Sequence, residues 1–296
     1  REIKVWAGLN KLNSFVMPYL FGTFVLIKYT FMLKFISFGS GSSGNCYYLY
    51  TETDALLIDA GVGIRKLKKH FHDYGLKLNS IHNILITHDH ADHVKSVGSL
   101  SQSLNVPVYS TKSIHSGIYK NWGVRKKVPA TNQYLLQKGE SIKIGEFLVT
   151  SFMVPHDSTD CIGFKIECNG IVFSIITDCG HVTEEISKIV EISNYLVVEA
   201  NYDPEMLIEG PYPKYLKDRI MSPTGHLSNN ECGQLLAEYS TSKLRHVWLC
   251  HLSEENNHPE LARKSVEAAI RNTRDSYDSF TIDVLKRKIP SEIFEL

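Results

Sequence analysis

The sequence lacks an excess of charge of either sign and lacks a cysteine framework. Its 296 residues include 32 Lys and Arg against 32 Asp and Glu, so the formal net charge is zero and composition provides no pull toward nucleic acid. The six cysteines form no Cys-x-x-Cys pair; they are Cys46, Cys161, Cys168, Cys179, Cys232 and Cys250. Their scatter excludes a disulfide-built scaffold and predicts reduced, buried thiols in a cytoplasmic protein.

Long apolar runs are also scarce. One such run, residues 15–33, reads FVMPYLFGTFVLIKYTFML and is interrupted by Pro18 and Lys28. No small-residue cleavage site follows it, which disfavours a secretory signal, and a membrane anchor is a second interpretation. We favour a third, in which residues 1–31 are an N-terminal extension outside the fold and residues 32–296 form the folded domain. No stable membrane association is then expected, unless residues 15–33 serve as an anchor.

Strand and helix patterns alternate along the rest of the chain. Short apolar runs predict strands at 35–38, 46–50, 55–58, 81–87, 106–109, 134–136, 147–154, 162–168, 171–176, 195–199 and 246–250. Amphipathic spacing predicts helices at 63–74, 91–104, 110–122, 183–193, 227–240 and 259–271. Alternation in two halves, each of which begins with strands, predicts an α/β fold of two sheets with helices outside.

A cluster of histidines and acids follows one predicted strand, where residues 87–93 read THDHADH. Residues two apart in an extended turn point the same way, so His88 and His90 can bind one ion together. Asp92 and His93 can then turn toward a second ion, about 3.5–4 Å from the first in the usual two-metal site. Mixed imidazole and carboxylate ligands suit zinc, with manganese and iron as alternatives.

Further ligands are expected at other strand ends, where rigid elements hold imidazole and carboxylate groups in place. His156, Asp178 and His251 each follow an apolar run, and a carboxylate at Asp178 could bridge both ions. Asp59 also ends a strand, and we expect it to orient a ligand imidazole by accepting a hydrogen bond. The other histidines are assigned to surface or packing positions: His70, His72, His82, His115, His181, His246 and His258.

These residues resemble the metallo-β-lactamase superfamily. Its ordered pattern of Asp, His-x-His-x-Asp-His, His, Asp and His is matched by Asp59, His88, His90, Asp92, His93, His156, Asp178 and His251. The resemblance covers residues 34 to about 255 and implies an αββα sandwich, two mixed β-sheets flanked by helices, with the site at one edge. It also implies two divalent metal ions per chain, Zn or Mn with Fe as an alternative, held by every residue of that pattern except Asp59.

Two more features indicate which branch of the superfamily the sequence resembles. Asp178 stands where the best-known β-lactamases carry a cysteine, which favours hydrolases of phosphodiesters or thioesters. Glu199 and His226 lie in segments that resemble the Glu-Ala-Thr and Gly-His-Met/Leu-Ser/Thr segments of the tRNA 3′-processing endonucleases, which place a catalytic histidine beside the metals. Asn201 replaces the threonine, and this departure weakens the transfer to tRNA processing.

Three longer segments, FGSGSSGN at 38–45, GHLSN at 225–229 and HLSEENN at 251–257, resemble the YycJ (WalJ) family of bacterial exonucleases. That family is linked to 5′→3′ digestion of double-stranded DNA. The resemblance therefore implies a metal-dependent phosphodiesterase, a nuclease that acts on DNA rather than RNA in DNA repair. No inserted β-CASP domain is evident between Asp178 and His226, so the RNA-maturation enzymes that carry one fit less well.

The mechanism that this hypothesis implies uses three catalytic residues. Two metal ions share a hydroxide that attacks phosphorus in line. Asp92 ligates one metal and orients the nucleophile, while His226, held by Glu199, protonates the leaving oxygen.

The loop at residues 39–45 is a candidate for substrate contact, since its free backbone N–H groups could touch phosphates. Its candidate side chains are Ser40, Ser42, Ser43 and Asn45. A plain flexible turn is the equal alternative. Lys66, Lys68 and Lys69 could reach a nucleic-acid backbone, but a solvated helix face is the favoured interpretation.

Other functions share this ligand pattern. A thioester hydrolase of the glyoxalase II type is the alternative enzyme, although it would not need His226 paired with Glu199. A di-iron oxygen or nitric-oxide reductase would carry a flavin domain, which the sequence does not suggest. A binding-only module would be expected to have lost ligands, whereas this chain has the full set.

Overall fold

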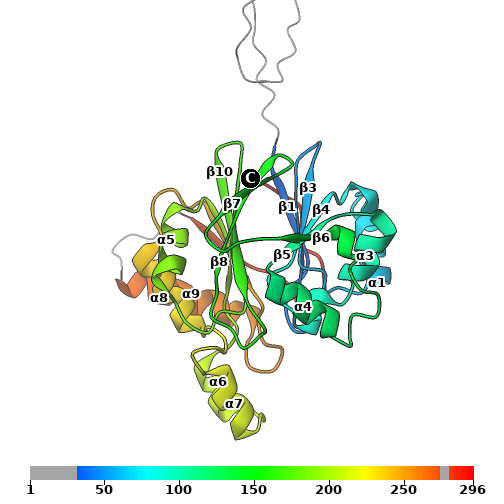
Figure 1. The fold of residues 1–296 in the computed structure, drawn as a ribbon. Coiled ribbons are helices and arrows are strands. Elements are labelled where there is room, and N and C mark those ends of the chain that lie inside the picture. The colour runs from blue at the N-terminus through cyan, green and yellow to red at the C-terminus, as the bar shows by residue number, and fades with distance from the viewer. Residues whose placement is uncertain (1–31, 274–279) are drawn as a thin grey trace, which may run out of the picture.

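The computed structural model describes residues 32–273 and 280–296, which form two seven-stranded sheets packed face to face between layers of helices (Figure 1). This arrangement is an αββα sandwich, so the predicted fold class is confirmed. The predicted extension, residues 1–31, lies outside the described residues. Within the two described ranges, every helix is too short or too polar to cross a bilayer.

The first sheet has the strand order β14-β1-β2-β3-β4-β5-β6. Its strands are β1 (Lys34–Gly39), β2 (Cys46–Tyr50), β3 (Ala55–Ile58), β4 (Asn83–Leu85), β5 (Val108–Ser110), β6 (Gln133–Leu135) and β14 (Phe294–Glu295). Strand β2 is antiparallel to both β1 and β3, and the pairs from β3 to β6 are parallel. The carboxyl ends of β1, β3 and β4 therefore lie at one edge.

The second sheet has the order β13-β12-β11-β10-β9-β8-β7. Its strands are β7 (Ser141–Ile144), β8 (Phe147–Met153), β9 (Ile162–Cys168), β10 (Ile171–Ile176), β11 (Tyr195–Glu199), β12 (His246–Cys250) and β13 (Thr281–Val284). Strands β10 to β13 are parallel, and β8 runs with them because β9 is antiparallel to both β8 and β10. The ends of β8, β10, β11 and β12 thus share an edge.

Helices cover the outer face of each sheet (Figure 1). On the side of the first sheet lie α1 (Ile64–Asp73), α2 (Ala91–Val94), α3 (Val97–Leu104), α4 (Lys112–Lys120) and the 3-10 turns Leu78–Ser80 and Ala130–Asn132. On the side of the second sheet lie α5 (Glu184–Ile192), α8 (Asn229–Tyr239) and α9 (Pro259–Thr273). A further pair, α6 (Pro204–Glu209) and α7 (Lys214–Ile220), projects from the edge where β11 ends.

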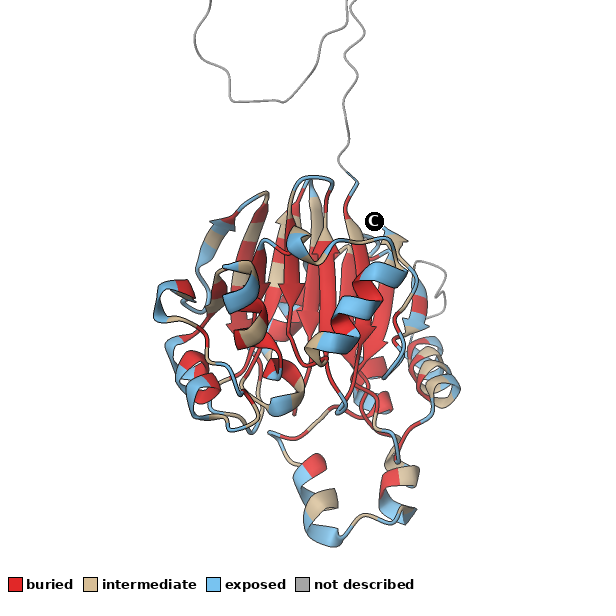
Figure 2. Ribbon diagram, turned by 90° about the vertical axis from the view of Figure 1, so that its right-hand side faces the viewer, coloured by how far each residue is buried: buried red, intermediate tan, exposed pale blue. Residues whose placement is uncertain are grey.

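Large apolar side chains fill the space between the sheets. Phe35 of the first sheet lies 4.7 Å from Trp248 and 5.1 Å from Phe173 of the second, between ring centroids. The central strands are buried along their whole length (Figure 2), which explains why they are continuous apolar runs in the sequence rather than alternating ones. This rigid core fixes the relative positions of the strand ends.

The structure corrects two predicted elements. The predicted strand 81–87 is shorter, because the chain leaves the first sheet at Thr87, whose carbonyl accepts a hydrogen bond from Ile162 of the second sheet at 3.0 Å. The predicted helix 91–104 is broken at Ser96, whose N–H and hydroxyl both bind carbonyls of the Ala60–Val62 turn. The sequence patterns predict none of the short elements α6, α7, β7, β13 and β14.

Candidate metal centre

Strand ends from both sheets meet at one edge of the sandwich, and the predicted site residues lie there. Asp59 follows β3, Asp178 follows β10 and His251 follows β12, with left-handed φ angles of 58°, 54° and 52°. Such backbone is uncommon outside glycine and gathers at functional sites. A β-bridge between His88 and Cys161 joins the chain after β4 to the second sheet. Side chains from the two sheets therefore face one another.

His88, His90 and His156 form a first group, in which one ring nitrogen of each lies within 4.8 Å of the others. His90 Nδ1 and His156 Nε2 are 3.3 Å apart. His88 is fully buried, and its Nε2 has no hydrogen-bond partner among the residues that the structure describes. A buried nitrogen without a partner costs free energy, and a cation between the three rings would satisfy it.

Asp92, His93 and His251 form a second group, also within 4.8 Å of one another. Asp92 Oδ2 lies 3.4 Å from His251 Nε2 and 3.7 Å from His93 Nε2. Two imidazoles and a carboxylate at this spacing form a donor set that suits zinc or manganese.

Asp178 lies between the two groups. One of its oxygens is 3.2 Å from His93 Nε2, and the other is 3.7 Å from His156 Nε2. The carboxylate is buried and therefore faces both groups without competition from solvent. The residues present thus fit a cation in each group, and Asp178 is close enough to both groups to be a candidate shared ligand.

Buried acceptors orient the rings of these groups. Asp59 accepts a hydrogen bond from His93 Nδ1 at 2.7 Å, and its other oxygen accepts from the Thr87 N–H at 2.9 Å. The Gly225 carbonyl accepts from His156 Nδ1 at 3.1 Å. In each ring the contact engages Nδ1 and leaves Nε2 to face the centre.

Glu199 is a fully buried carboxylate that connects two histidines. Its Oε1 accepts from His226 Nδ1 at 2.8 Å and lies 3.0 Å from His251 Nδ1. Its Oε2 accepts from the backbone N–H groups of Cys179 and Leu227 at 2.9 and 3.1 Å. Glu199 therefore fixes His226 next to the second group without itself lying at the surface.

The Glu199–His226 contact also sets the charge of both residues. Burial alone would lower the pKa of His226, yet Glu199 raises it above its ordinary value. Burial alone would raise the pKa of Glu199, yet His226 and His251 lower it. His226 is therefore stabilised as an imidazolium. Since Nδ1 faces Glu199, Nε2 is the nitrogen that can pass a proton to a bound molecule.

The rings and carboxylates of the two groups attract positive charge. Burial alone would lower the pKa of His93, yet Asp178 and Asp59 raise it to about 10. Burial alone would raise the pKa of Asp178, yet His251 and His93 hold it well below its usual range. Burial holds the pKa of His88 well below its ordinary value, so this imidazole is neutral and able to ligate. Protons and cations therefore compete for the same place.

The loop at residues 39–45 places its four candidate side chains in two different environments. Ser40 and Asn45 are fully buried. The Ser40 hydroxyl accepts from the His251 N–H at 2.9 Å, and Asn45 Nδ2 lies 2.8 Å from His93 Nε2. Ser40 thus holds the backbone of His251, whereas Asn45 contacts the His93 nitrogen that faces the centre. Ser42 and Ser43 are exposed, so they alone of the four can reach a bound molecule.

Sequence reasoning missed three contributors to this geometry: Thr87, Gly225 and Asn201. The Asn201 side chain donates to the His251 carbonyl at 2.7 Å, so the residue that departs from the endonuclease pattern holds the turn after β12. Thr87 precedes the histidine motif directly, and its polar side chain at the end of an apolar run was the available signal. Every residue has a backbone carbonyl, so the sequence carries no signal that the Gly225 carbonyl acts as an acceptor.

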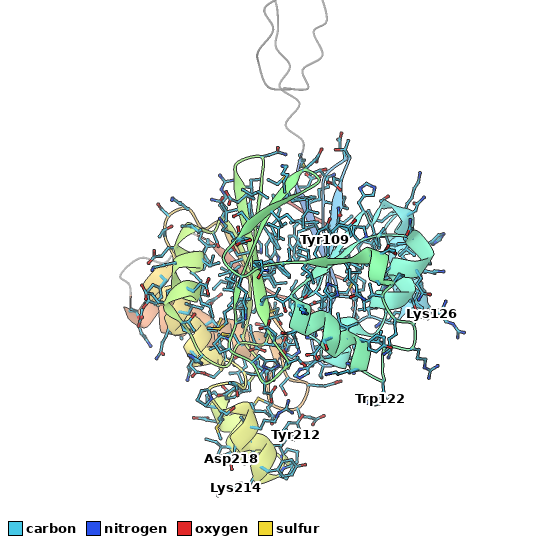
Figure 3. The ribbon with its side chains drawn as sticks, in the orientation of Figure 1. Tyr109, Trp122, Lys126, Tyr212, Lys214 and Asp218 are labelled. Atoms are coloured by element: carbon cyan, nitrogen blue, oxygen red, sulfur yellow. The ribbon has the colours of Figure 1, made fainter. Side chains whose placement is uncertain are left out.

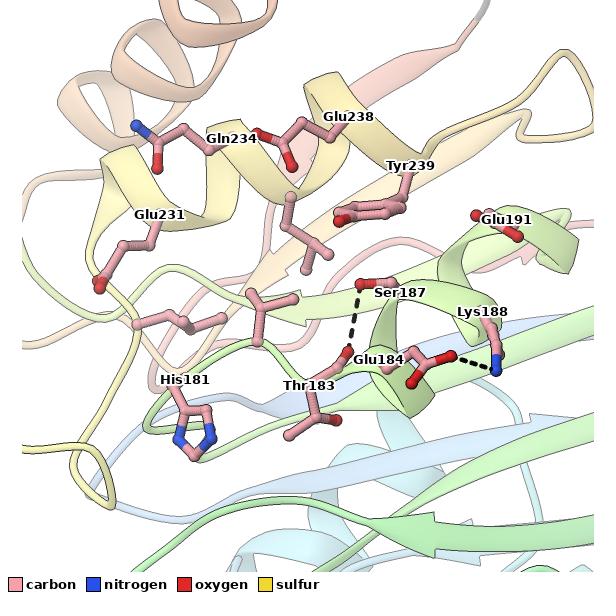
Figure 4. Close-up of a pocket in the computed structure, with 13 residues that line it drawn as sticks. His181, Thr183, Glu184, Ser187, Lys188, Glu191, Glu231, Gln234, Glu238 and Tyr239 are labelled. Atoms are coloured by element: carbon pink, nitrogen blue, oxygen red, sulfur yellow. Dashed lines mark hydrogen bonds and ion pairs between the residues drawn. The ribbon is translucent and has the colours of Figure 1, made fainter.

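The seven histidines assigned to surface or packing positions lie outside every metal-ligand group found among the described residues. His181 lines a hollow of about 630 Å³ between α5 and α8 (Figure 4), which contains none of the predicted site residues. Four glutamates also line this hollow, and they make it unsuited to a polyanion: Glu184, Glu191, Glu231 and Glu238. All six cysteines are buried and free, as predicted.

Comparison with protein families agrees with this geometry. A family described as "Beta-lactamase superfamily domain" matches residues 55–251, which span the strands from β3 to β12 and the first residue after β12. The chain belongs to the metallo-β-lactamase superfamily.

Curated relatives identify the branch of that superfamily. The chain is 32% identical over 266 residues to exodeoxyribonuclease YycJ of Bacillus anthracis, covering 88% of this chain and 98% of the relative. It is 32% identical over 233 residues to exodeoxyribonuclease WalJ of Streptococcus pneumoniae, covering 79% and 86%. Within the superfamily, the chain is a member of the YycJ/WalJ family.

Solved structures share the fold at low identity. Zn²⁺-bound PqqB from Methylobacterium extorquens aligns with a TM-score of 0.68 and 19% identity over 88% of this chain and 99% of that one. The short form of human tRNase Z aligns with a TM-score of 0.58 and 17% identity over 88% and 98%. These likenesses concern the fold alone.

Proposed function

We propose that the chain is a dinuclear metallohydrolase that cleaves phosphodiester bonds in nucleic acid. The observation that carries this proposal is the contact between His226 and Glu199 beside the two ligand groups. A hydrolase of thioesters needs no cationic imidazole at this place, because a thiolate leaves readily. An alkoxide leaving from phosphorus needs a proton, which His226 can provide.

The chain's own residues perform three tasks in this mechanism. The two ions, when bound by the residues of the two groups and by Asp178, supply Lewis acidity that activates water and neutralises phosphoryl charge. Asp92, whose side chain is partly exposed, orients the attacking water by accepting its hydrogen bond. His226 holds a proton at Nε2 for the leaving oxygen, and Glu199 keeps the ring charged and oriented.

We further propose that the substrate is double-stranded DNA digested from its 5′ end, in DNA repair, with Zn or Mn as the metal. The names of the YycJ and WalJ relatives support DNA over RNA. We also propose that residues 32–296 form the hydrolase domain and that residues 1–31 are an extension. The buried, unpaired cysteines support a cytoplasmic location.

A nuclease assay with a matched pair of variants tests the proposal. The purified chain, loaded with Mn²⁺ or Zn²⁺, is incubated with end-labelled DNA duplexes and with RNA duplexes of the same sequence. The wild-type chain should release nucleotides from the 5′ end of DNA. His226→Ala should lower kcat by about 10²–10⁴-fold, the usual contribution of a general acid, while the bound metal content is unchanged.

His72→Ala is the control, since that side chain is exposed on α1, outside the ligand groups. Survival of full activity in His226→Ala, or loss of metal in place of turnover, would contradict the assigned role. Faster turnover of S-lactoylglutathione than of DNA would instead identify the chain as a thioester hydrolase.

A further inference from the structure

A groove of about 910 Å³ opens beside the candidate metal centre. Asp92 is part of its lining, which ties the groove to the second ligand group. Ser42 and Ser43 also line it, and these are the two loop serines that remain exposed. A molecule bound along the groove would therefore extend to the candidate metal ligands.

The groove concentrates positive charge in a chain with no net charge. Four cationic side chains line it, namely Arg65, Lys66, Lys95 and Arg125, against a single acid, Asp92. Of these cations, Lys66 donates to the Lys288 carbonyl. Over the described part of the chain, Arg65, Lys95 and Arg125 are exposed and form no ion pair. Unpaired cations along a groove are the usual means of holding a phosphate backbone.

Trp122 stands at the wall of the same groove and is 93% exposed. Its loop is held rigidly against the histidine motif: Asn121 Nδ2 donates to the Asp89 carbonyl at 2.7 Å, and the Gly123 N–H donates to Asn121 Oδ1 at 2.9 Å. A large apolar ring held in solvent gains nothing for folding. Its free face is a platform on which a base can stack.

We propose that this groove binds one unpaired nucleic-acid strand, with its phosphates on Arg65, Lys95 and Arg125 and a base stacked on Trp122. The inference deepens the proposed nuclease function and rests on it. A base must be unpaired to cover the indole face. The groove therefore takes a frayed or single-stranded segment, while a duplex end must open to place its strand here.

The projecting pair α6–α7 is the rival surface. It carries Tyr215, which is 75% exposed, together with Lys214, on the side of the second sheet. Figure 3 shows Tyr212 and Lys214 on this projection and Trp122 below the helices of the first sheet, so the two surfaces belong to different parts of the molecule. The Trp122 groove includes Asp92 of the second ligand group, which is why we favour it over the α6–α7 surface.

Strand binding is measured by fluorescence anisotropy in a metal-loaded His226→Ala background, which prevents cleavage of the probe. The probe is a 5′-phosphorylated, 3′-fluorescein-labelled dT₁₂, and a second probe of equal length carries abasic sites. Trp122→Ala should weaken dT₁₂ binding by about 5- to 150-fold, the usual loss of one stacked base, and leave the abasic probe unchanged. Tyr215→Ala is the matched aromatic control and should have no effect.

The charged residues are tested by salt dependence. Lys95→Ala and Arg125→Ala should each reduce the slope of log K against log salt by about 0.7, the value for one contact to a single strand. Lys264→Ala, an exposed lysine on α9, should leave the slope unchanged. Because Trp122 and Arg125 are exposed, these variants should keep the wild-type melting temperature.

Three results would overturn the proposal: no dT₁₂ binding by the parent, equal weakening of both probes by Trp122→Ala, or a larger loss from Tyr215→Ala. The nuclease function fails separately, if the metal-loaded wild-type chain hydrolyses neither DNA nor bis(p-nitrophenyl) phosphate.

Discussion

At the scale of single residues, closely packed backbone segments hold the candidate ligand residues in place. Gly61 lies so near the first turn of α2 that a Cβ built on it would come within 1.6 Å of the Asp92 carbonyl oxygen. The Gly61 N–H also donates to the Asn45 carbonyl at 2.8 Å. One glycine therefore permits the packing of the Asn45 loop, the turn after β3 and the histidine motif against one another.

Replacement of Gly61 should displace Asp92. We expect Gly61→Ala to lower the free energy of unfolding by about 1–3 kcal/mol, the usual cost of overpacking, and to weaken metal binding. Gly63→Ala is the matched control, since a Cβ there meets nothing within 4 Å. Urea denaturation and metal content measure both effects. Equal stability of the two variants would show that the turn can relax around the added methyl group.

At the scale of secondary-structure elements, helix α4 determines where the Trp122 loop lies. Its N-cap Thr111 accepts from the Ile114 N–H, and its buried His115 contacts the Tyr134 carbonyl of β6 through Nε2 at 3.1 Å. Burial lowers the pKa of His115, so the ring is neutral in the folded chain. The helix end, and with it the exposed Trp122, is thus anchored to the sheet through an uncharged histidine.

A fall in pH should weaken the contact between His115 and the Tyr134 carbonyl. The unfolded chain takes up a proton at His115 at higher pH than the folded chain does, so its contribution to stability is present above about pH 6.5 and is lost as pH falls further. His115→Gln keeps a donor for the Tyr134 carbonyl but cannot be protonated. Between pH 7.5 and 5.5, the wild-type chain should therefore lose more stability than His115→Gln in urea denaturation.

Exposed His72 supplies the control for this comparison. His72→Gln should follow the wild-type dependence on pH, and chelator in every sample removes any contribution of bound metal. Parallel curves for the wild-type chain and His115→Gln would show that the histidine remains neutral, or equally protonated, in both states.

At the scale of the whole molecule, the two sheets contribute different candidate ligands. His88, His90, Asp92 and His93 follow β4 of the first sheet, whereas His156, Asp178 and His251 follow strands of the second. Each ligand group draws on both sheets. Bound metal would therefore cross-link the two halves of the sandwich, in addition to its role in hydrolysis.

Removal of metal should lower the melting temperature. A ligand present at 100 times its dissociation constant stabilises the folded state by about 2.7 kcal/mol, so excess Mn²⁺ or Zn²⁺ should raise the midpoint and a chelator should reverse the change. His88→Ala should reduce this response, while His72→Ala should keep it. A midpoint that is independent of metal in the wild-type chain would contradict the assigned ligand groups.

The sequence was sufficient for the elements and residue types that depend on local pattern. Continuous apolar runs predicted the buried strands, and the polar residues directly after them, such as Asp178 and His251, were recognisable because strand ends are rigid and converge at one edge. The fold class followed from the alternation of strands and helices. Short edge strands such as β7 and β14 were missed because runs of four and two residues are too short for their pattern to stand out from the surrounding loops.

Tertiary packing decided what local pattern does not encode. The glycine-rich loop looked flexible in the sequence, yet Ser40 and Asn45 are buried against His251 and His93, because residues more than 40 positions away close over them. The shared contact of Glu199 with two histidines, and the groove that combines Asp92 with Trp122, likewise arise from segments far apart in the chain. The sequence alone determined which groups could bind metal; the packing of the two sheets determined where each one points.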